Sequence, residues 1–85
     1  YAGGFTIYPV PNDGSFNVSI FSPTSQSFTL DIYNNIGVRI YQSESFTVNG
    51  TVDKPINLKP VTAGLYTVVL KSADSKIIKK FIVNR

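Results

Sequence analysis

Residues 15–21 read Ser-Phe-Asn-Val-Ser-Ile-Phe, and residues 27–33 read Ser-Phe-Thr-Leu-Asp-Ile-Tyr. In both stretches apolar residues alternate with polar ones, which predicts β-strands with one face in a core and the other in water. No segment shows a sustained period of 3.6 residues, so no helix is expected. Similar patterns predict further strands near residues 4–8, 37–42, 45–49, 55–58, 64–71 and 76–84.

The expected strands are separated by residues that favour turns. Pro11-Asn12-Asp13-Gly14 combines a proline of fixed φ with a glycine that tolerates positive φ, and Asn34-Asn35-Ile36-Gly37, Asn49-Gly50 and Ser72-Ala73-Asp74-Ser75 have the same character. Seven or eight short antiparallel strands at this spacing predict an all-β, immunoglobulin-like β-sandwich, with the last two strands forming a hairpin.

The composition limits what chemistry the chain offers. Its 85 residues are enough for one domain, residues 1–85, with one core. The sequence has no Cys, His, Met or Trp, so it lacks disulfides, thiolate ligands and the commonest general base. The acids Asp13, Asp31, Glu44, Asp53 and Asp74 are scattered, without the spacing of a shared site. We therefore expect no enzyme activity, no catalytic residues, no metal, no cofactor and no small-molecule substrate.

Positive charge is concentrated at the C-terminal end. The net charge is +3, and the last fifteen residues contribute +4 of charge through five cations and one acid, so residues 1–70 sum to −1. The charged residues of that end are Lys71, Asp74, Lys76, Lys79, Lys80 and Arg85. These cations lack the dense clustering and interleaved aromatic residues of a phosphate-binding surface, so no nucleic acid partner is expected.

The last expected strand departs from simple alternation. Apolar residues at 77, 78, 81, 82 and 83 bracket the pair Lys79-Lys80 and fall on both faces. We expect either that the strand is covered on both sides or that a bulge near the lysine pair redirects its side chains. Two roles for the lysines stay open: protection of an edge strand against aggregation, and recognition of a partner by charge and strand addition.

Three stretches together resemble one known family. Residues 8–18 are similar to its Tyr-Pro-Asn-Pro-x-x-Gly opening, with Val10 where Asn is usual, and residues 30–41 are similar to its IYN-x-x-G-x-x-VY hairpin. Residues 56–58, 63–68 and 79–85 resemble its Gly-x-Tyr strand and its lysine-bearing terminal strand. The family is the type A C-terminal sorting domain of the type IX secretion system of the Bacteroidetes.

The resemblance implies a non-catalytic export and surface-attachment signal. It implies a covalently linked N-terminal passenger, passage through the periplasm, and delivery to the cell surface or the medium. The implied partners are the outer-membrane translocon, its carrier barrel and a sortase-like peptidase. Carried over by position, the recognition residues are Gly64, Tyr66, Lys79, Lys80 and Arg85. Pro9, Pro11, Gly14 and Gly37 are expected to shape turns.

The start at Tyr1, which is not a methionine, agrees with a single domain excised from a longer secreted protein. Two other hypotheses stay open. A carbohydrate-binding or adhesive module of a surface enzyme would expose an aromatic platform, for which Tyr8, Tyr33 and Tyr41 are the candidates. An inert immunoglobulin-like spacer would instead lie between other domains.

Overall fold

The two alternating stretches predicted within residues 15–33 form one continuous strand in the computed structural model, which describes residues 3–84. Five further strands complete the described part of the chain. In order, the strands are β1 (Gly4–Tyr8), β2 (Ser15–Tyr33), β3 (Arg39–Gln42), β4 (Phe46–Asn57), β5 (Gly64–Lys71) and β6 (Lys76–Val83). All of their pairings are antiparallel, so the all-β class is confirmed.

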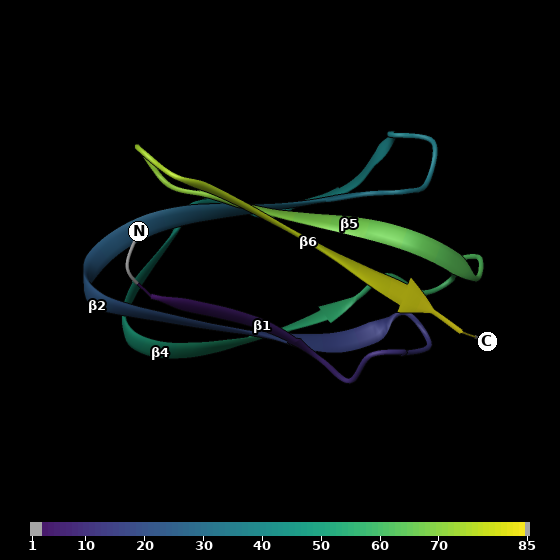
Figure 1. The fold of residues 1–85 in the computed structure, drawn as a ribbon, viewed down its shortest axis with the longest axis horizontal. Helices are drawn as coiled ribbons and strands as arrows, with labels where there is room; N and C mark the ends of the chain where they lie inside the picture. The colour runs from purple at the N-terminus through teal and green to yellow at the C-terminus, as the bar shows by residue number, and fades with distance from the viewer. Residues whose placement is uncertain (1–2, 85) are drawn as a thin grey trace.

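The strands form two layers that face each other (Figure 1). In sheet A the first half of β2 lies between β1 and β4. In sheet B the second half of β2 lies between β3 and β5, and β6 pairs with the far side of β5. Figure 1 shows β2 and β4 curving from one layer to the other at the same end of the molecule. The arrangement is that of a β-sandwich whose sheets share a strand.

The bend of β2 lies at a break in its pairing with β4. Ser22 is opposite Gly50, but the next pair joins Gln26 to Val48, so three residues of β2 face one residue of β4. The Ser22 hydroxyl donates to the Thr24 carbonyl inside this bulge. Gly50 has φ +86°, a backbone conformation that favours glycine. An irregularity of this kind lets a strand turn a corner without ending.

The core lies between the sheets and follows the predicted alternation. Residues 16, 18 and 20 of β2, residues 66, 68 and 70 of β5, and residues 81 and 83 of β6 all point inward and are buried. The Phe16 and Phe81 ring centroids are 4.7 Å apart, so the aromatic rings of the two sheets contact each other. Burial of these side chains from both layers is what holds the sandwich together.

The sequence predicted seven or eight strands, whereas the described residues form six. The segments predicted at 15–21 and 27–33 are both part of β2, and those at 45–49 and 55–58 are both part of β4. In the prediction, residues 22–26 and residues 50–54 separated the members of each pair. In the structure these residues bend a strand that continues from one sheet into the other.

Candidate functional site

The hairpin of β5 and β6 forms one edge of sheet B. Its pairing runs without interruption from Gly64 opposite Val83 to Lys71 opposite Lys76. In the described part of the chain, the outer edge of β6 is covered only at its end. There the Asn12 amide donates to the Ile82 carbonyl at 3.1 Å, and the Asn84 amide donates to the Asn12 carbonyl at 2.7 Å. Among residues 3–84, no strand pairs with the earlier part of that edge.

Neither expectation for β6 is correct. Its register against β5 contains no bulge, and the strand is not covered on both faces, because Ile78 and Ile82 are 54% and 51% exposed. Only the odd-numbered side chains from 77 to 83 turn toward the core side. The apolar residues on both faces therefore reflect an edge strand with one buried face and one apolar face in solvent.

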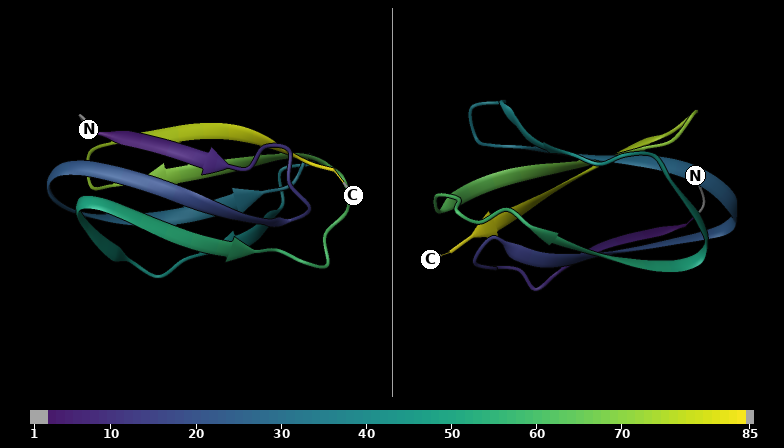
Figure 2. Two further views of the ribbon diagram at one scale, coloured as in Figure 1. Left: turned by 90° about the horizontal axis from the view of Figure 1, so that it is seen from below. Right: turned by 180° about the vertical axis from the view of Figure 1, so that it is seen from behind.

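Lys79 and Lys80 point to opposite sides of sheet B. Lys79 lies on the core side between Ile77 and Phe81, and its Nζ atom is 5.9 Å from the centroid of the Phe5 ring in β1. Figure 2 shows β1 and β6 as the neighbouring edges of the two layers. Lys80 lies on the outer side, opposite Thr67 of β5. The two ammonium groups therefore do not form one cluster.

Gly64 and Tyr66 both lie on β5. Gly64 opens the strand with φ +151°. Tyr66 is only 4% exposed, its ring is stacked on Phe81 at 5.7 Å, and its hydroxyl donates to the Thr62 carbonyl at 2.6 Å. A partner cannot contact this side chain in the folded domain. Any effect of Tyr66 on recognition would come through the position of the hairpin.

The outer side of the hairpin carries apolar side chains that the sequence interpretation did not assign to the site. Leu65 is 44% exposed and is the cross-strand partner of Ile82. Val69 is the partner of Ile78 on the same side. The sequence signal was the apolar residues on both faces of β6, which were expected to be covered although an edge position for this strand was also left open.

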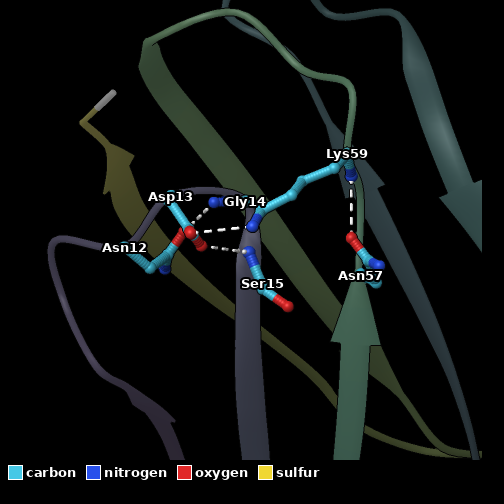
Figure 3. Close-up of polar contacts among 6 residues, drawn as sticks. All are labelled: Asn12, Asp13, Gly14, Ser15, Asn57 and Lys59. Atoms are coloured by element: carbon cyan, nitrogen blue, oxygen red, sulfur yellow. Dashed lines mark hydrogen bonds and ion pairs between the residues drawn. The ribbon is translucent and has the colours of Figure 1, made fainter.

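The turn over residues 9–14 links β1 to β2 and contacts Lys59, which follows β4 (Figure 3). The Asn12 side chain donates to the Pro9 carbonyl at 3.0 Å and accepts from the Gly14 amide at 2.9 Å. Lys59 Nζ lies 2.8 Å from Asp13 Oδ2. This contact, together with the Ser15 amide that donates to Asp13, lowers the pKa of the Asp13 carboxyl below its ordinary value.

The glycines of the two turns differ in the space around them. Gly14 has φ +103°, and a Cβ atom there would lie 2.6 Å from Val61 Cγ1. Gly37 has φ +86° with open space around it, and its amide donates to the Asn34 carbonyl at 3.1 Å. Pro9 and Pro11 flank the Asn12 segment that reaches β6. These placements fit turn-shaping roles for all four residues.

The three tyrosines of the carbohydrate-binding hypothesis do not share one face. Tyr8 lies on the outer side of sheet A and donates to Asp53 Oδ1 at 3.3 Å. Tyr33 lies on the outer side of sheet B, whereas Tyr41 is opposite inward-facing Ile32 and packs against the core. The structure therefore does not assemble the aromatic platform that this hypothesis requires.

Arg85 lies outside the described residues. Within residues 3–84, no three His, Cys, Asp or Glu side chains are grouped as metal ligands. The same part of the chain has no helix of the length and apolar character needed to cross a membrane.

Comparison with protein families gives one match across nearly the whole chain. A family model described as "Secretion system C-terminal sorting domain" matches residues 6–84. A search of curated proteins gave no significant match. The matched region includes all six strands except the first residues of β1, and it contains the hairpin of β5 and β6.

Proposed function

Because the chain belongs to the family of C-terminal sorting domains of the type IX secretion system, we propose that it is a non-catalytic signal for export and surface attachment, recognised by the secretion machinery through the β5–β6 hairpin. The observation that carries the proposal is the family match over residues 6–84. A sorting signal for this system is directed to the cell surface or secreted.

The position of the hairpin supports its role in recognition. β6 contacts the rest of sheet B only through β5, and its edge before Ile82 has no partner strand in the described part of the chain. An extended segment of a partner could add to this edge through backbone hydrogen bonds. Lys76, Lys79 and Lys80 place positive charge along the same strand, which favours an acidic partner and speeds its approach.

The proposed recognition residues have different roles. Lys80 contacts the partner directly, because its side chain is exposed on the outer side of the hairpin. Gly64 and Tyr66 position β5, and Lys79 protects the edge between the sheets while remaining accessible. Arg85 is proposed on the family resemblance alone.

The proposed partners are the outer-membrane translocon, its carrier barrel and a sortase-like peptidase that acts between this domain and its passenger. The passenger is linked to the N-terminal side and reaches the outer membrane through the periplasm. No cofactor, nucleic acid or small-molecule substrate takes part in this proposal.

Export of a reporter tests the function. Residues 1–85 are fused to the C-terminus of a fluorescent protein that carries a general export signal, and the fusion is expressed in a bacterium with the type IX system. We expect fluorescence outside wild-type cells and periplasmic retention in a translocon-deficient strain. Retention in both strains would contradict the proposal.

A further inference from the structure

The outer side of the β5–β6 hairpin exposes apolar side chains next to one another. Leu65, Ile78 and Ile82 are 44%, 54% and 51% exposed. Leu65 is paired across the strands with Ile82, and Ile78 with Val69, so the apolar groups are arranged over both strands. Cross-strand partners have Cβ atoms about 5 Å apart, so Leu65 and Ile82 form one apolar pair and Ile78 and Val69, which is 8% exposed, form a second, with the pair of Thr67 and Lys80 between them.

Cations lie inside this surface and not only around it. Along β6 the outward positions are Lys76, Ile78, Lys80 and Ile82, so lysine and isoleucine alternate at successive outward positions. On β5 the outward Thr67 lies opposite Lys80. We call the six residues Leu65, Val69, Lys76, Ile78, Lys80 and Ile82 the β5–β6 outer face.

The outer side of sheet A has a different character. The outward residues there are mainly Ser, Thr, Asn and Asp, as in the pair of Ser19 with Asp53. Phe21 is 45% exposed, as much as Leu65, and its strand partners on that side are Gly4 and Thr51. Groups of exposed apolar residues, unlike scattered ones, mark contact sites on a protein surface.

A buried carboxylate lies beside the apolar groups of this face. Asp31 of β2 is the cross-strand partner of Val69 and is 1% exposed. Its Oδ2 atom is 3.1 Å from Lys71 Nζ, but its Oδ1 atom has no hydrogen-bond partner among the described residues. A buried acceptor without a donor is costly. Since Asp31 is 1% exposed, a partner cannot reach its carboxylate, and the charges that a partner can meet on this face are those of the lysines of β6.

We propose that the β5–β6 outer face docks a protein surface on which apolar side chains are interspersed with carboxylates. This proposal rests on the proposed function and names the chemistry of the partner that reads the hairpin. The apolar groups supply contact area, and a carboxylate opposite Lys80 supplies complementary charge within the buried area. The carboxylate is needed because the ammonium group of Lys80, if it were buried in the interface without an opposite charge, would oppose binding.

The arrangement of charge favours a protein over a lipid surface. A side of a protein that enters a bilayer keeps its cations at the rim, because an ammonium group in the hydrocarbon region costs about 2.5–3.5 kcal/mol. Lys80 lies between Ile78 and Ile82, in the middle of the apolar area. A protein can place a carboxylate at that position, and hydrocarbon chains offer nothing to pair with it.

The test compares matched variants of the exported fluorescent fusion. The double variant Ile78→Ser, Ile82→Ser removes two apolar groups of the face from β6. Leu65→Ser removes an apolar group of the face from β5. Phe21→Ser, on sheet A, is the control. Since centrally buried contact residues each contribute more than about 1 kcal/mol, the double variant is expected to lower export about tenfold or more. Phe21→Ser is expected to leave export unchanged, and thermal unfolding of each purified domain establishes that it is folded.

Each outcome has a defined meaning. If the unchanged fusion is not exported, the proposed function fails before the face is tested. If the unchanged fusion is exported and both serine variants on the hairpin are exported equally well while folded, the docking proposal is wrong and the sorting function stands. Equal loss of export in Phe21→Ser would also overturn it, since the effect would then not belong to this face.

Two further measurements test whether the β5–β6 outer face instead binds a lipid surface or a second copy of this chain. The purified domain is floated with phosphatidylglycerol vesicles, and its mass is measured by sedimentation equilibrium. We expect that the domain does not bind the vesicles. We also expect no dimer whose formation is lost in the double variant. Vesicle binding that is lost in the double variant would show that the face binds a lipid surface. A dimer that is lost in the double variant would show that the face binds a second copy of this chain. Either result would overturn the proposal.

Discussion

The ammonium group of Lys79 lies 5.9 Å from the centroid of the Phe5 ring, so the last strand contacts the first across the open side between the two sheets. Lys80, its neighbour in sequence, points the other way and has no such contact with the core side. The two lysines should therefore affect different properties of the domain.

Lys79→Gln should lower the free energy of unfolding by about 0.5–1 kcal/mol, the usual size of an exposed cation–π contact, with little change in export. Lys80→Glu should leave stability within about 0.5 kcal/mol and reduce export of the fusion. Urea unfolding and the export assay measure the two effects. The separation of roles is wrong if Lys79→Gln impairs export more than Lys80→Glu does.

Gly14→Ala should destabilise the domain by about 2–4 kcal/mol, because the substitution adds backbone strain of about 1–2 kcal/mol to a steric overlap of about 1–2 kcal/mol. The overlap is with Val61 Cγ1, 2.6 Å from the added Cβ atom. Gly37→Ala is the control, since Gly37 also has positive φ but open space around it. Its cost should be limited to the strain, about 1–2 kcal/mol. If urea unfolding showed equal losses of unfolding free energy in Gly14→Ala and Gly37→Ala, the overlap with Val61 would be relieved without cost.

Tyr66→Phe should cost about 1 kcal/mol, because it removes the hydrogen bond to the Thr62 carbonyl and keeps the ring on Phe81. The phenylalanine variant should be exported normally, because the hydroxyl is inside the folded domain. Tyr66→Ala should cost about 3–5 kcal/mol through the cavity it leaves. Loss of export in a stably folded Tyr66→Phe variant would point instead to direct recognition of the hydroxyl.

The ion pair of Asp13 and Lys59 should make stability depend on pH in the acid range. The folded-state pKa of Asp13 is lowered from its ordinary value of 3.8, mainly by the contact with Lys59. The contribution is therefore present above pH 3.8 and is lost as the pH falls through the lower, folded-state value. A carboxyl titration by NMR should show the pKa of Asp13 rising in Lys59→Gln. An unchanged pKa in that variant would mean that the Ser15 amide alone causes the shift.

Replacing Lys71 should destabilise the domain, whereas replacing its ion-pair partner Asp31 should not. Lys71→Met leaves the buried Asp31 carboxylate without its cation and should cost about 3–5 kcal/mol. Asp31→Val removes the buried charge and leaves a lysine that is 43% exposed to water, so it should be neutral or stabilising by about 1 kcal/mol. Urea unfolding of both variants decides this, and a larger loss for Asp31→Val would show that the ion pair itself stabilises the sheet.

The sequence predicted the core because side chains in a strand alternate between faces. Residues such as Val18 and Leu30 are buried as their period-two pattern requires. The continuity of β2 was not predictable in this way. Ser22-Pro23-Thr24 has turn chemistry, and only pairing with β4, distant in sequence, decides that the chain bends there without reversing.

The candidate site was predicted in part for a similar reason. The hairpin and its lysines follow from local pattern, but the opposite orientations of Lys79 and Lys80 depend on an uninterrupted register, which the sequence analysis did not expect. The exposure of Ile78 and Ile82 could not be read from the pattern, because burial of an apolar face depends on which strand ends the sheet. That order is set by contacts between distant segments.

In the described part of the chain, the backbone of β6 pairs only with β5 and, at its end, with Asn12, whereas β2 pairs with four other strands. During assembly, β2 can serve as a template for most of the molecule, and β6 can add only once β5 is in place. The inner side of the hairpin is buried against the other sheet through residues such as Phe81 and Val83, so its outer face is held in place only when the two sheets are packed. A partner that binds this face distinguishes a finished domain from a partly assembled one, so binding itself acts as a check on folding.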